Sequence, residues 1–565
     1  MIKEFILTAA VIVFFAPHLP AQPTVASGGV LNVASYSYPP LPGGSIAEGS
    51  MFTVFGGNMG TTFTGSLSFP LKTSMLNTSI KVTSGATSVD ALMIFTSAGQ
   101  VTAILPSNTP VGSATLTLTF NGQTSSPVPI QIVPSSFGAF TLNQAGSGPG
   151  IIQEFGGTEA VPPVNAIVSP SYPGQTVALW GTGLGPITGD DAEAPVQVNM
   201  QTAFDVQVWV GNKQATVTYA GRSSCCAAVD VVYFVVPPGI QGCYVPVVVK
   251  AGKAGVVGNV TSMAVAPNAG GVCSDGDGID PADVKTLQSS GSVRLGAVSL
   301  TRIEINAAAL GETISAVSDS ANSVFGRYSP AQLSASLGLT QSPSVGYCTV
   351  SQFLGLNPLP VDPIKPTPLD AGASLSISGP AGTKAIPSSS TGVFSATLGG
   401  VELDQILTGT PGPPFLLPGS YTITGSGGSA VGSFSQQFTI PTDVTWTNST
   451  ITTIDRSKDL TITWTGGGSN DYVAITGLGV TATGPLGPST TSPGNLFLCV
   501  VPAGEGTFTV PSIVLQALPT SAASAIPTSF LLVGTELEPV KFNASGLDDG
   551  YVIYRSLTGN NVTIQ

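Results

Sequence analysis

Short apolar runs separated by turn residues constrain the fold of this chain more than any other feature. The runs are rich in Val, Ile, Thr and Phe, and long stretches with a helical period of 3.6 residues are almost absent. In residues 206–210, three valines alternate with Gln207 and Trp209, which gives a strand one apolar face. The 69 glycines and 46 prolines supply turns between the runs. The pattern predicts an all-β chain of sandwiches.

The first half of the chain contains an internal repeat. Residues 42–60 and 173–185 each begin with Pro-Gly, continue as an apolar strand and end in a glycine-rich loop. The repeat predicts two tandem modules, residues 28–134 and residues 158–267. A Gly/Ser-rich stretch at 146–157 is predicted to be the linker between them.

Both repeats also carry the spaced motifs of known domain families. The second repeat resembles an IPT/TIG-type immunoglobulin-like domain. It begins with a Pro-Gly entry at Pro173-Gly174 and a strand that ends in glycine at Trp180-Gly181. A Val-x-Val-Gly strand (208–211), a Val-Pro turn (236–239) and a final Val-rich strand (245–249) follow. Other segments are similar to a narrower family of uncharacterised secreted proteins known chiefly from acidobacteria: Asn32-x-Ala34-Ser35, 100–106, 147–150, 221–230 and Gly242-Cys243. The resemblance implies tandem immunoglobulin-like sandwiches and supplies no catalytic residues.

Two further units are predicted in the second half. Residues 283–443 combine a partly irregular or helical insert near 283–345 with a β-sandwich, and residues 444–565 form a last β-sandwich. Within the insert, residues 313–325 are compatible with a helix. Ser329 followed by Pro330 predicts the start of a short helix, because Ser caps helices and Pro suits their first position.

The N-terminus predicts export. Lys3 precedes an eleven-residue apolar run, residues 5–15, and small Ala21 follows. This order is typical of a signal peptide, here residues 1–21, and the run is too short to cross a bilayer. We therefore expect a secreted or cell-surface protein with no membrane span in the mature chain.

The amino-acid composition excludes several classes of function. His18 is the single histidine, and cleavage would remove it, which excludes Ser-His-Asp or Cys-His catalysis and His-ligated metals. Only 8% of the residues are charged, with a net charge of −13, so the cationic surface that nucleic acid requires is lacking. No cofactor motif is present. We expect a protein that is not an enzyme.

Six cysteines suit an oxidising compartment. Four lie within residues 225–273, where two local bridges are the simplest arrangement, and the other two would pair with each other or stay free. A metal site is disfavoured because no Cys-x-x-Cys spacing exists. The pairing is left open among Cys225, Cys226, Cys243, Cys273, Cys348 and Cys499.

An acidic stretch is the one candidate for a metal. Asp275, Asp277 and Asp280, with Asp283 beyond them, could offer carboxylates to calcium, the only cofactor that the sequence suggests. Their spacing is not that of an EF-hand loop. The simpler interpretation is a solvated acidic linker.

Two tryptophans are candidates for ligand binding. Trp180 and Trp209 are out of phase with the apolar residues of their strands, which predicts that both lie on the outer face of the second repeat. There they could stack on sugars or contact a partner. The simpler interpretation, which we favour, is that they pack at the boundary between the two repeats, with Phe55 in the equivalent place.

Three function classes remain. The leading hypothesis is a secreted, non-catalytic adhesion protein that recognises a polysaccharide or a cell-surface protein. The first alternative is a structural spacer or surface-layer component without a small ligand. The second is a glycoside hydrolase using two carboxylates, for which Asp190, Asp191 and Glu193 are the candidates, although acidic residues on a Gly/Pro loop are usually solvated.

Overall fold

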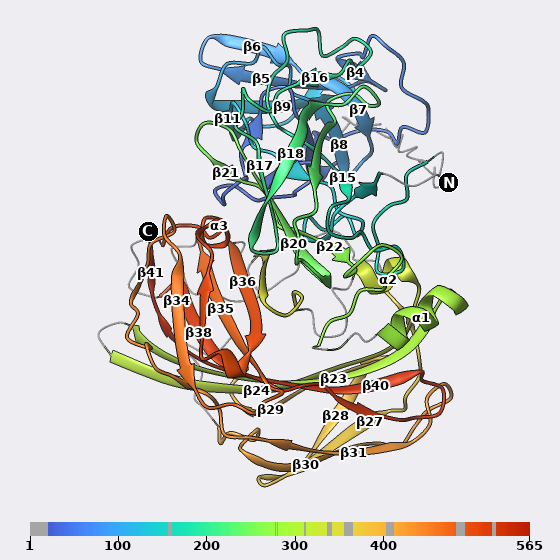
Figure 1. Cartoon of the computed structure of the whole chain (residues 1–565). Helices are drawn as coiled ribbons and strands as arrows, with labels where there is room; N and C mark the ends of the chain where they lie inside the picture. Colours follow the sequence, from blue (N-terminus) through green and yellow to red (C-terminus); the bar gives the residue numbers. More distant parts are fainter. Residues whose placement is uncertain are drawn as a thin grey trace, which may run out of the picture.

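The structure of the protein is a computed structural model that describes residues 21–155, 161–276, 278, 281–309, 312–335, 342–354, 365–402, 412–481, 492–521 and 527–565. The chain is all-β, as the sequence predicts. Figure 1 shows two modules, module 1 (24–133) and module 2 (138–265), above a larger C-terminal unit (281–565). Apart from Ala21, the predicted signal peptide lies outside the described residues. No described helix is long and apolar enough to cross a membrane.

Module 1 is a sandwich of two sheets around one core. Its Val, Ile, Phe and Met side chains alternate toward the space between the sheets, where Phe52, Val54 and Leu116 are fully buried. One sheet has the order β1 (Thr24–Asn32), β3 (Met51–Gly57), β8 (Gln100–Ile104), β7 (Leu92–Thr96). The other contains β2 (Ile46–Ala47), β11 (Val128–Val133), β9 (Gly112–Phe120), β5 (Thr78–Ser84), β4 (Ser74–Met75), β6 (Thr87–Asp90) and β10 (Gln123–Thr124).

Module 2 is one sheet folded onto itself. Strand β18 (Lys213–Arg222) pairs with β17 (Gln207–Val210) through its first half and with β19 (Asp230–Val235) through its second, so the sheet turns a corner there. The remaining strands are β12 (Gly138–Ala139), β13 (Gly148–Pro149), β14 (Ile152–Glu154), β15 (Thr176–Thr182), β16 (Val198–Asn199), β20 (Gly242–Ala251), β21 (Val256–Val257) and β22 (Thr261–Val265).

The stretch 146–157 is not a free linker. It contains β13, which pairs with β22, and β14, which pairs with β15, so its described part belongs to module 2. Gly146 and Gly150 in this stretch make close contacts. At Gly146, with φ of +71°, an added Cβ would lie 2.0 Å from the carbonyl oxygen of Ser35 in module 1.

The C-terminal unit is built on one large sheet. The ranges 283–443 and 444–565 both contribute strands to it, so the predicted boundary at 443/444 does not separate two sandwiches. Its order is β25 (Tyr347–Leu354), β36 (Pro493–Pro502), β35 (Tyr472–Val480), β38 (Ser529–Glu536), β40 (Asp549–Asn561), β23 (Val293–Ala309), β24 (Glu312–Tyr328), β29 (Val393–Gly400), β28 (Gly382–Ser390), β27 (Ser374–Gly379), β30 (Gly419–Gly425) and β31 (Phe434–Ile440), with β26 (Thr367–Pro368) and β39 (Val540–Phe542) beside it.

Smaller elements complete this unit. Strands β32 (Thr445–Trp446), β34 (Leu460–Thr465) and β37 (Thr507–Val510) form one sheet, and β33 (Thr453–Ile454) pairs with β41 (Thr563–Ile564). The helices within the described residues are α1 (Pro281–Ser290), α2 (Pro330–Ala335), α3 (Ser512–Leu515) and the 3₁₀ turn η2 (Ala503–Glu505).

The expected helix at 313–325 is wrong, because these residues lie in β24. Strands β23 and β24 pair over 17 residues, and β40 pairs in parallel with β23. This pairing with distant strands overrides a local pattern of small residues that does not itself favour a strand. The helix predicted from Ser329-Pro330 is confirmed as α2, where the amide of Gln332 donates to Ser329 Oγ and the amide of Ser329 donates to Gln332 Oε1.

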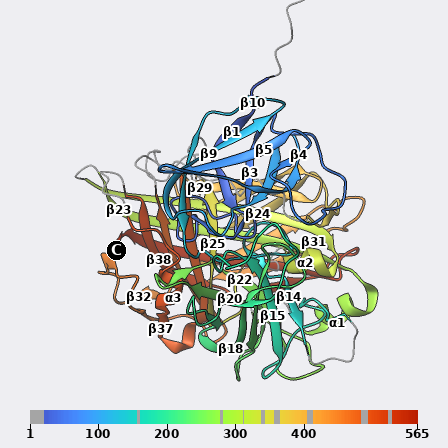
Figure 2. The same cartoon turned by 90° about the horizontal axis from the view of Figure 1, so that it is seen from above.

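Module 2 is joined to the C-terminal unit by shared cores. Val248, Val257 and Val260 of module 2 pack with the core beside β34, β35 and β36. A second cluster joins Cys243 and Tyr244 to α1, β23 and β40. Figure 2 shows the strands of module 2 lying directly over the C-terminal unit.

Candidate binding surface

The outer face of module 2 carries a row of aromatic side chains. On β15, Val177 and Leu179 are fully buried while Trp180 is partly exposed, and on β19 Tyr233 is partly exposed between buried Val232 and Phe234. The register pairs Trp180 with Val231 and Ala178 with Tyr233, so the two rings project from the same face as diagonal neighbours.

Two more rings extend this row. The centroid of the Phe155 ring lies 5.3 Å from that of Tyr233, and the centroid of the Tyr219 ring lies 5.8 Å from it on the other side. Both side chains are partly exposed. We call Phe155, Trp180, Tyr219 and Tyr233 the aromatic surface. It spans β15, β19 and β18 and the residue after β14.

Hydrogen bonds fix two of these rings. The indole Nε1 of Trp180 donates to Gln153 Oε1 at 3.0 Å, which orients the ring against β14. The hydroxyl of Tyr219 donates to the carbonyl of Arg222 at 2.8 Å, and burial raises the pKa of this hydroxyl, so it stays protonated. Because the surface is held by a sheet and by these bonds, its rings are already ordered for contact with a ligand.

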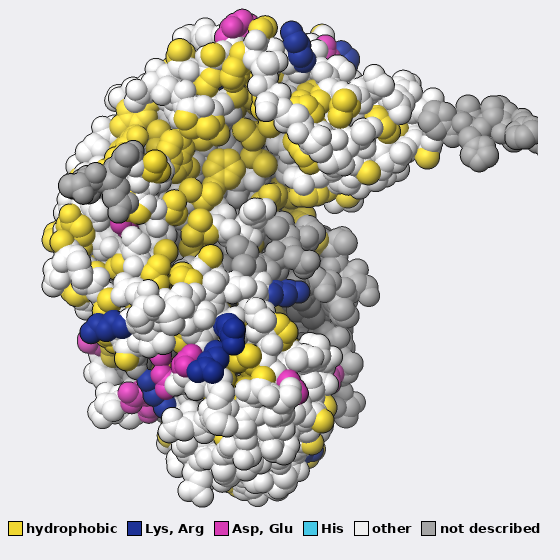
Figure 3. Space-filling view, turned by 90° about the vertical axis from the view of Figure 1, so that its right-hand side faces the viewer, with side chains coloured by type: hydrophobic (Ala, Val, Ile, Leu, Met, Phe, Trp, Pro, Cys, Tyr) yellow, Lys and Arg dark blue, Asp and Glu magenta, His cyan; other side chains and the backbone are white. Residues whose placement is uncertain are grey.

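The aromatic surface lies in an uncharged region. The outward positions of β15 and β19 are Thr176, Ala178 and Trp180, and Val231, Tyr233 and Val235. Figure 3 shows the side of the molecule that is on the right in Figure 1, where many hydrophobic side chains reach the surface and charged ones are few. The surface therefore matches a ligand that is itself neutral and has apolar faces.

Trp209 does not belong to this surface. It lies on β17 opposite Val248 of β20, and it packs against the core of the C-terminal unit. The prediction that both tryptophans serve one outer face is therefore wrong. Both tryptophans are out of phase with the buried residues of their strands, as expected, but the C-terminal unit covers the side of module 2 on which Trp209 lies. Whether Trp180 binds a ligand stays a prediction.

The acidic loop at 190–193 does not offer a catalytic pair. Asp190 is exposed and accepts from the amide of Ala192, as turn residues do, and Glu193 is exposed. Asp191 accepts from the backbone amide and the hydroxyl of Ser107 in module 1, at 2.6 and 2.9 Å. Its oxygens are occupied by these donors.

Asp191 is instead part of a buried charge network between module 1 and module 2. Arg222 Nε donates to Asp230 Oδ1 at 2.8 Å, and its Nη1 lies 3.8 Å from Asp191. Arg222 Nη2 donates to the carbonyl of Gly49 in module 1 and to that of Gly185. We call Arg222, Asp230 and Asp191 the charge lock. All three side chains are at most 6% exposed.

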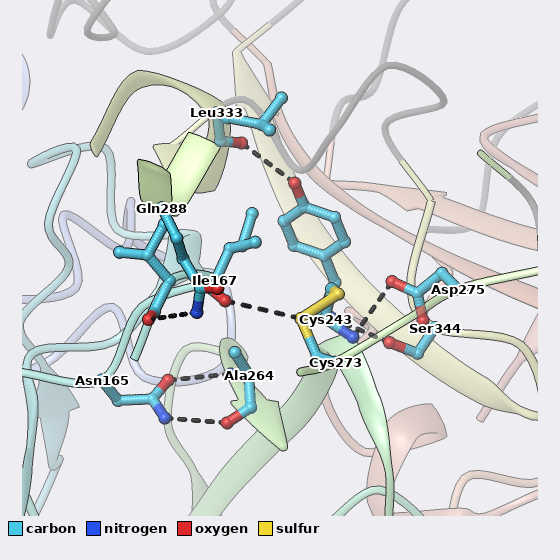
Figure 4. The surroundings of a disulfide bond; sticks show 11 residues. Asn165, Ile167, Cys243, Ala264, Cys273, Asp275, Gln288, Leu333 and Ser344 are labelled. Carbon is cyan, nitrogen blue, oxygen red and sulfur yellow. Dashed lines mark hydrogen bonds between the residues drawn. A yellow bond between two sulfur atoms is a disulfide. The ribbon is translucent and has the colours of Figure 1, made fainter. Parts of the chain in front are cut away.

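The two described residues of the acidic stretch, Asp275 and Asp283, are buried rather than solvated. Asp275 is buried and accepts from the amide of Cys243 at 3.1 Å, beside Ser344, whose Oγ accepts from the amide of Tyr244 (Figure 4). Asp283 is also buried, on α1, and accepts from the hydroxyl of Tyr551 at 2.5 Å. Asp277 and Asp280 lie outside the described residues. Within the described part of the chain, no three His, Cys, Asp or Glu side chains gather as metal ligands do.

Burial of Asp275 predicts a dependence of stability on pH. Loss of solvation raises the pKa of its carboxyl from 3.8 to about 6, against the hydrogen bonds from Ser344 and Cys243. The folded state then binds this proton more tightly than the unfolded chain, so the free energy of unfolding falls as pH rises from about 4 to about 6. Asp275→Asn removes the charge, and we expect it to be the more stable protein by up to about 3 kcal/mol at about pH 8.

Thermal unfolding of both proteins between about pH 4 and pH 8 checks this expectation. The two should be similar at the acid end and should diverge above it. Parallel curves over the whole range would contradict it.

The six cysteines form three disulfides. Two are local, Cys225–Cys226 and Cys243–Cys273, as the simplest arrangement had them, and Cys348 pairs with Cys499. The Cys225–Cys226 pair is exposed, on a loop whose Ala227 and Ala228 pack against Leu71 and Leu92 of module 1. The other two disulfides are buried.

Comparison with known proteins gives no family. No family model matches the chain, and no curated protein matches it. Solved structures with a likeness to it include domains 5–6 of the S-layer protein SbsC (16% identity, 44% of this chain, 100% of that chain, TM-score 0.18), immunoglobulin domains 1–4 of Sidekick-1 (10%, 93%, 97%, 0.11) and γ-CGTase from alkalophilic Bacillus clarkii (10%, 50%, 37%, 0.15). These scores are too low to carry a functional argument. The resemblance to IPT/TIG domains therefore stays a prediction.

Sequence reasoning missed three of the four residues of the aromatic surface. The out-of-phase signal that singled out Trp180 is absent for the two tyrosines. Tyr219 is in phase with Val217 of the core and turns outward only because the register shifts between them. Tyr233 lies in a strand that is apolar in both phases, so the strand phase does not show that it points outward. That these rings meet depends on the register of β18 against β19, which no single strand reveals.

Proposed function

We propose that this protein is an extracellular, non-catalytic binding protein whose aromatic surface holds a neutral polysaccharide chain. The observation that carries the proposal is the row of partly exposed rings on an uncharged sheet face. Sugar rings present apolar C–H faces to aromatic side chains and place their hydroxyl groups outward, toward polar neighbours such as Gln153. An extracellular location is supported by the three disulfides.

The charge of the surface argues for a saccharide over nucleic acid. Aromatic rings also stack on bases, but proteins that bind single strands combine such rings with a cationic groove along the phosphates. The outward positions of β15 and β19 carry no Lys or Arg, and the whole chain has a net charge of −13. A neutral polymer fits this surface, and a polyanion does not.

Removal of two rings tests the proposal. We expect Trp180→Ala/Tyr233→Ala to weaken binding to a neutral polysaccharide at least about tenfold, because each stacked ring contributes on the order of 1 kcal/mol or more. Affinity gel electrophoresis against cellulose derivatives, xylan, β-glucan and mannan measures the loss. Both replaced side chains are partly exposed, so the variant should keep its circular dichroism spectrum.

The matched control is Phe69→Ala. Phe69 is 42% exposed in a loop of module 1, away from the aromatic surface, and its loss should leave binding unchanged. If the wild-type protein binds none of the polymers, or if both variants lose binding equally, the proposal fails. The protein would then be a structural spacer of the kind that the sequence also allows.

A further inference from the structure

A large cleft lies where module 1, module 2 and the C-terminal unit meet. It has a volume of about 800 Å³, within the range of small-molecule sites, which often form between domains. It is lined by Leu41 of module 1, Ser135 of the segment between the two modules, Lys250 and Val257 of module 2, and Arg456 of the C-terminal unit. In Figure 1 it lies between β21 and β41, on the side of the molecule that carries the C-terminus. The aromatic surface is not part of this cleft.

The cleft holds two cations without a charge partner. Lys250 stands at the end of β20 and Arg456 follows β33. Among the described residues, neither has a carboxylate oxygen within 4.0 Å. The chain has only 17 Lys and Arg residues, so two of them facing one cleft from different units is an uncommon concentration of positive charge. The aliphatic part of the Lys250 side chain lies over Gly255. A Cβ added at residue 255 would be 2.5 Å from Lys250 Cε, so a glycine at 255 leaves room for the Lys250 side chain.

The acidic side chain in the cleft is paired within its own turn. Asp455 accepts from Lys458 Nζ at 2.8 Å and from the amide and hydroxyl of Ser457. These partners lower the pKa of Asp455 to about 2, so it stays ionised, and its ion pair is with Lys458 rather than with Arg456 or Lys250.

Unused hydrogen-bond donors occur at the same place. Arg456 donates through Nη1 to the carbonyl of Leu518, but its buried Nε has no partner in the described structure. The hydroxyl of Ser135, on a residue that is 5% exposed, also has none. Both atoms are buried behind the wall of the cleft, so neither reaches a ligand there directly. The wall itself offers a ligand the positive charge of Lys250 and Arg456.

We propose that this cleft binds an acidic saccharide, with the carboxylate of a sugar acid between Lys250 and Arg456. A carboxylate supplies the negative charge and the acceptor oxygens that the two cations lack. A cleft of this size exceeds what one inorganic anion fills, and its serine and glutamine side chains suit the hydroxyl groups of sugar rings. The binding is reversible and involves no covalent step.

Calorimetric titration of the full-length protein tests this site. The probes are trigalacturonate, neutral maltotriose and inorganic sulfate. We expect trigalacturonate to bind, with an affinity that falls as salt is added, and maltotriose and sulfate to bind at least tenfold more weakly. Lys250→Gln should weaken the binding of trigalacturonate at least tenfold.

Lys253→Gln is the matched control. It removes the same charge from an exposed position three residues further on that does not line the cleft, and it should change the affinity less than twofold. No binding of trigalacturonate, sulfate binding as tight as that of the saccharide, or equal losses in the two variants would each overturn the proposal. Because Trp180 and Tyr233 are not in the cleft, their double variant should bind trigalacturonate normally whether or not the aromatic surface holds a polymer.

Discussion

Replacing Arg222 by methionine is expected to lower the free energy of unfolding by about 3–5 kcal/mol. The substitution leaves the Asp230 carboxylate, which is fully buried, with an uncompensated charge among the amides of Gly183 and Leu184. It also removes the donor to the carbonyl of Gly49, one of the bonds that join module 1 to module 2. Equilibrium urea unfolding followed by circular dichroism measures the effect.

The control for the charge lock is Arg294→Met. Arg294 makes an equally short ion pair with Asp548, at 2.8 Å, but its side chain is 40% exposed. Exposed pairs of this kind are worth about 0–1 kcal/mol, so this variant should unfold almost as the wild type does. A second variant, Arg222→Met/Asp230→Asn, should recover part of the loss because it removes the stranded charge. Similar losses for Arg222→Met and Arg294→Met would contradict the assignment.

The second large effect is expected from the disulfide between β25 and β36. Cys348 and Cys499 are direct cross-strand partners that are 151 residues apart in sequence, and both are buried in the core of the C-terminal unit. Closing so long a loop restricts the unfolded chain strongly. Cys348→Ala/Cys499→Ala should therefore lower the free energy of unfolding by about 3–5 kcal/mol.

The adjacent pair provides the comparison. Cys225→Ala/Cys226→Ala opens a bridge between neighbouring residues, so it frees the unfolded chain very little and should cost about 1 kcal/mol or less. Scanning calorimetry of both double variants distinguishes the cases. The expectation is wrong if the adjacent pair proves the more stabilising of the two.

The local parts of the fold could be predicted from the sequence. Strand alternation and turn residues gave the all-β class, and Ser329-Pro330 gave the start of α2, because both signals are carried by neighbouring residues. The shared sheet of the C-terminal unit could not be predicted in this way. Its central pairing joins β23 to β40, about 250 residues later in the chain. The sequence of each strand by itself is equally typical of a strand in a small sandwich.

For the candidate sites, too, the local features could be predicted from the sequence and the contacts between units could not. The strand phase correctly predicted that Trp180 lies on an outer face of module 2. It also correctly predicted that Trp209 points away from the core of module 2. What lies opposite each ring depends on how the units dock, and the C-terminal unit covers Trp209 while leaving Trp180 partly exposed. The charge lock was missed for the same reason, since Asp191 looks like a solvated turn residue until Ser107 of module 1 is beside it.

The pairing of β40 with β23 also sets an order for biosynthesis. Modules 1 and 2 contain all of their strands within residues 24–265, so each can close while the rest of the chain is still being made. In the C-terminal unit, β23 must wait for β40, which follows about 250 residues later in the chain. Until then a 17-residue strand has an open edge to which another nascent chain can add. A chain that stops before β40 would retain that edge, so correct folding of this unit depends on the synthesis of β40.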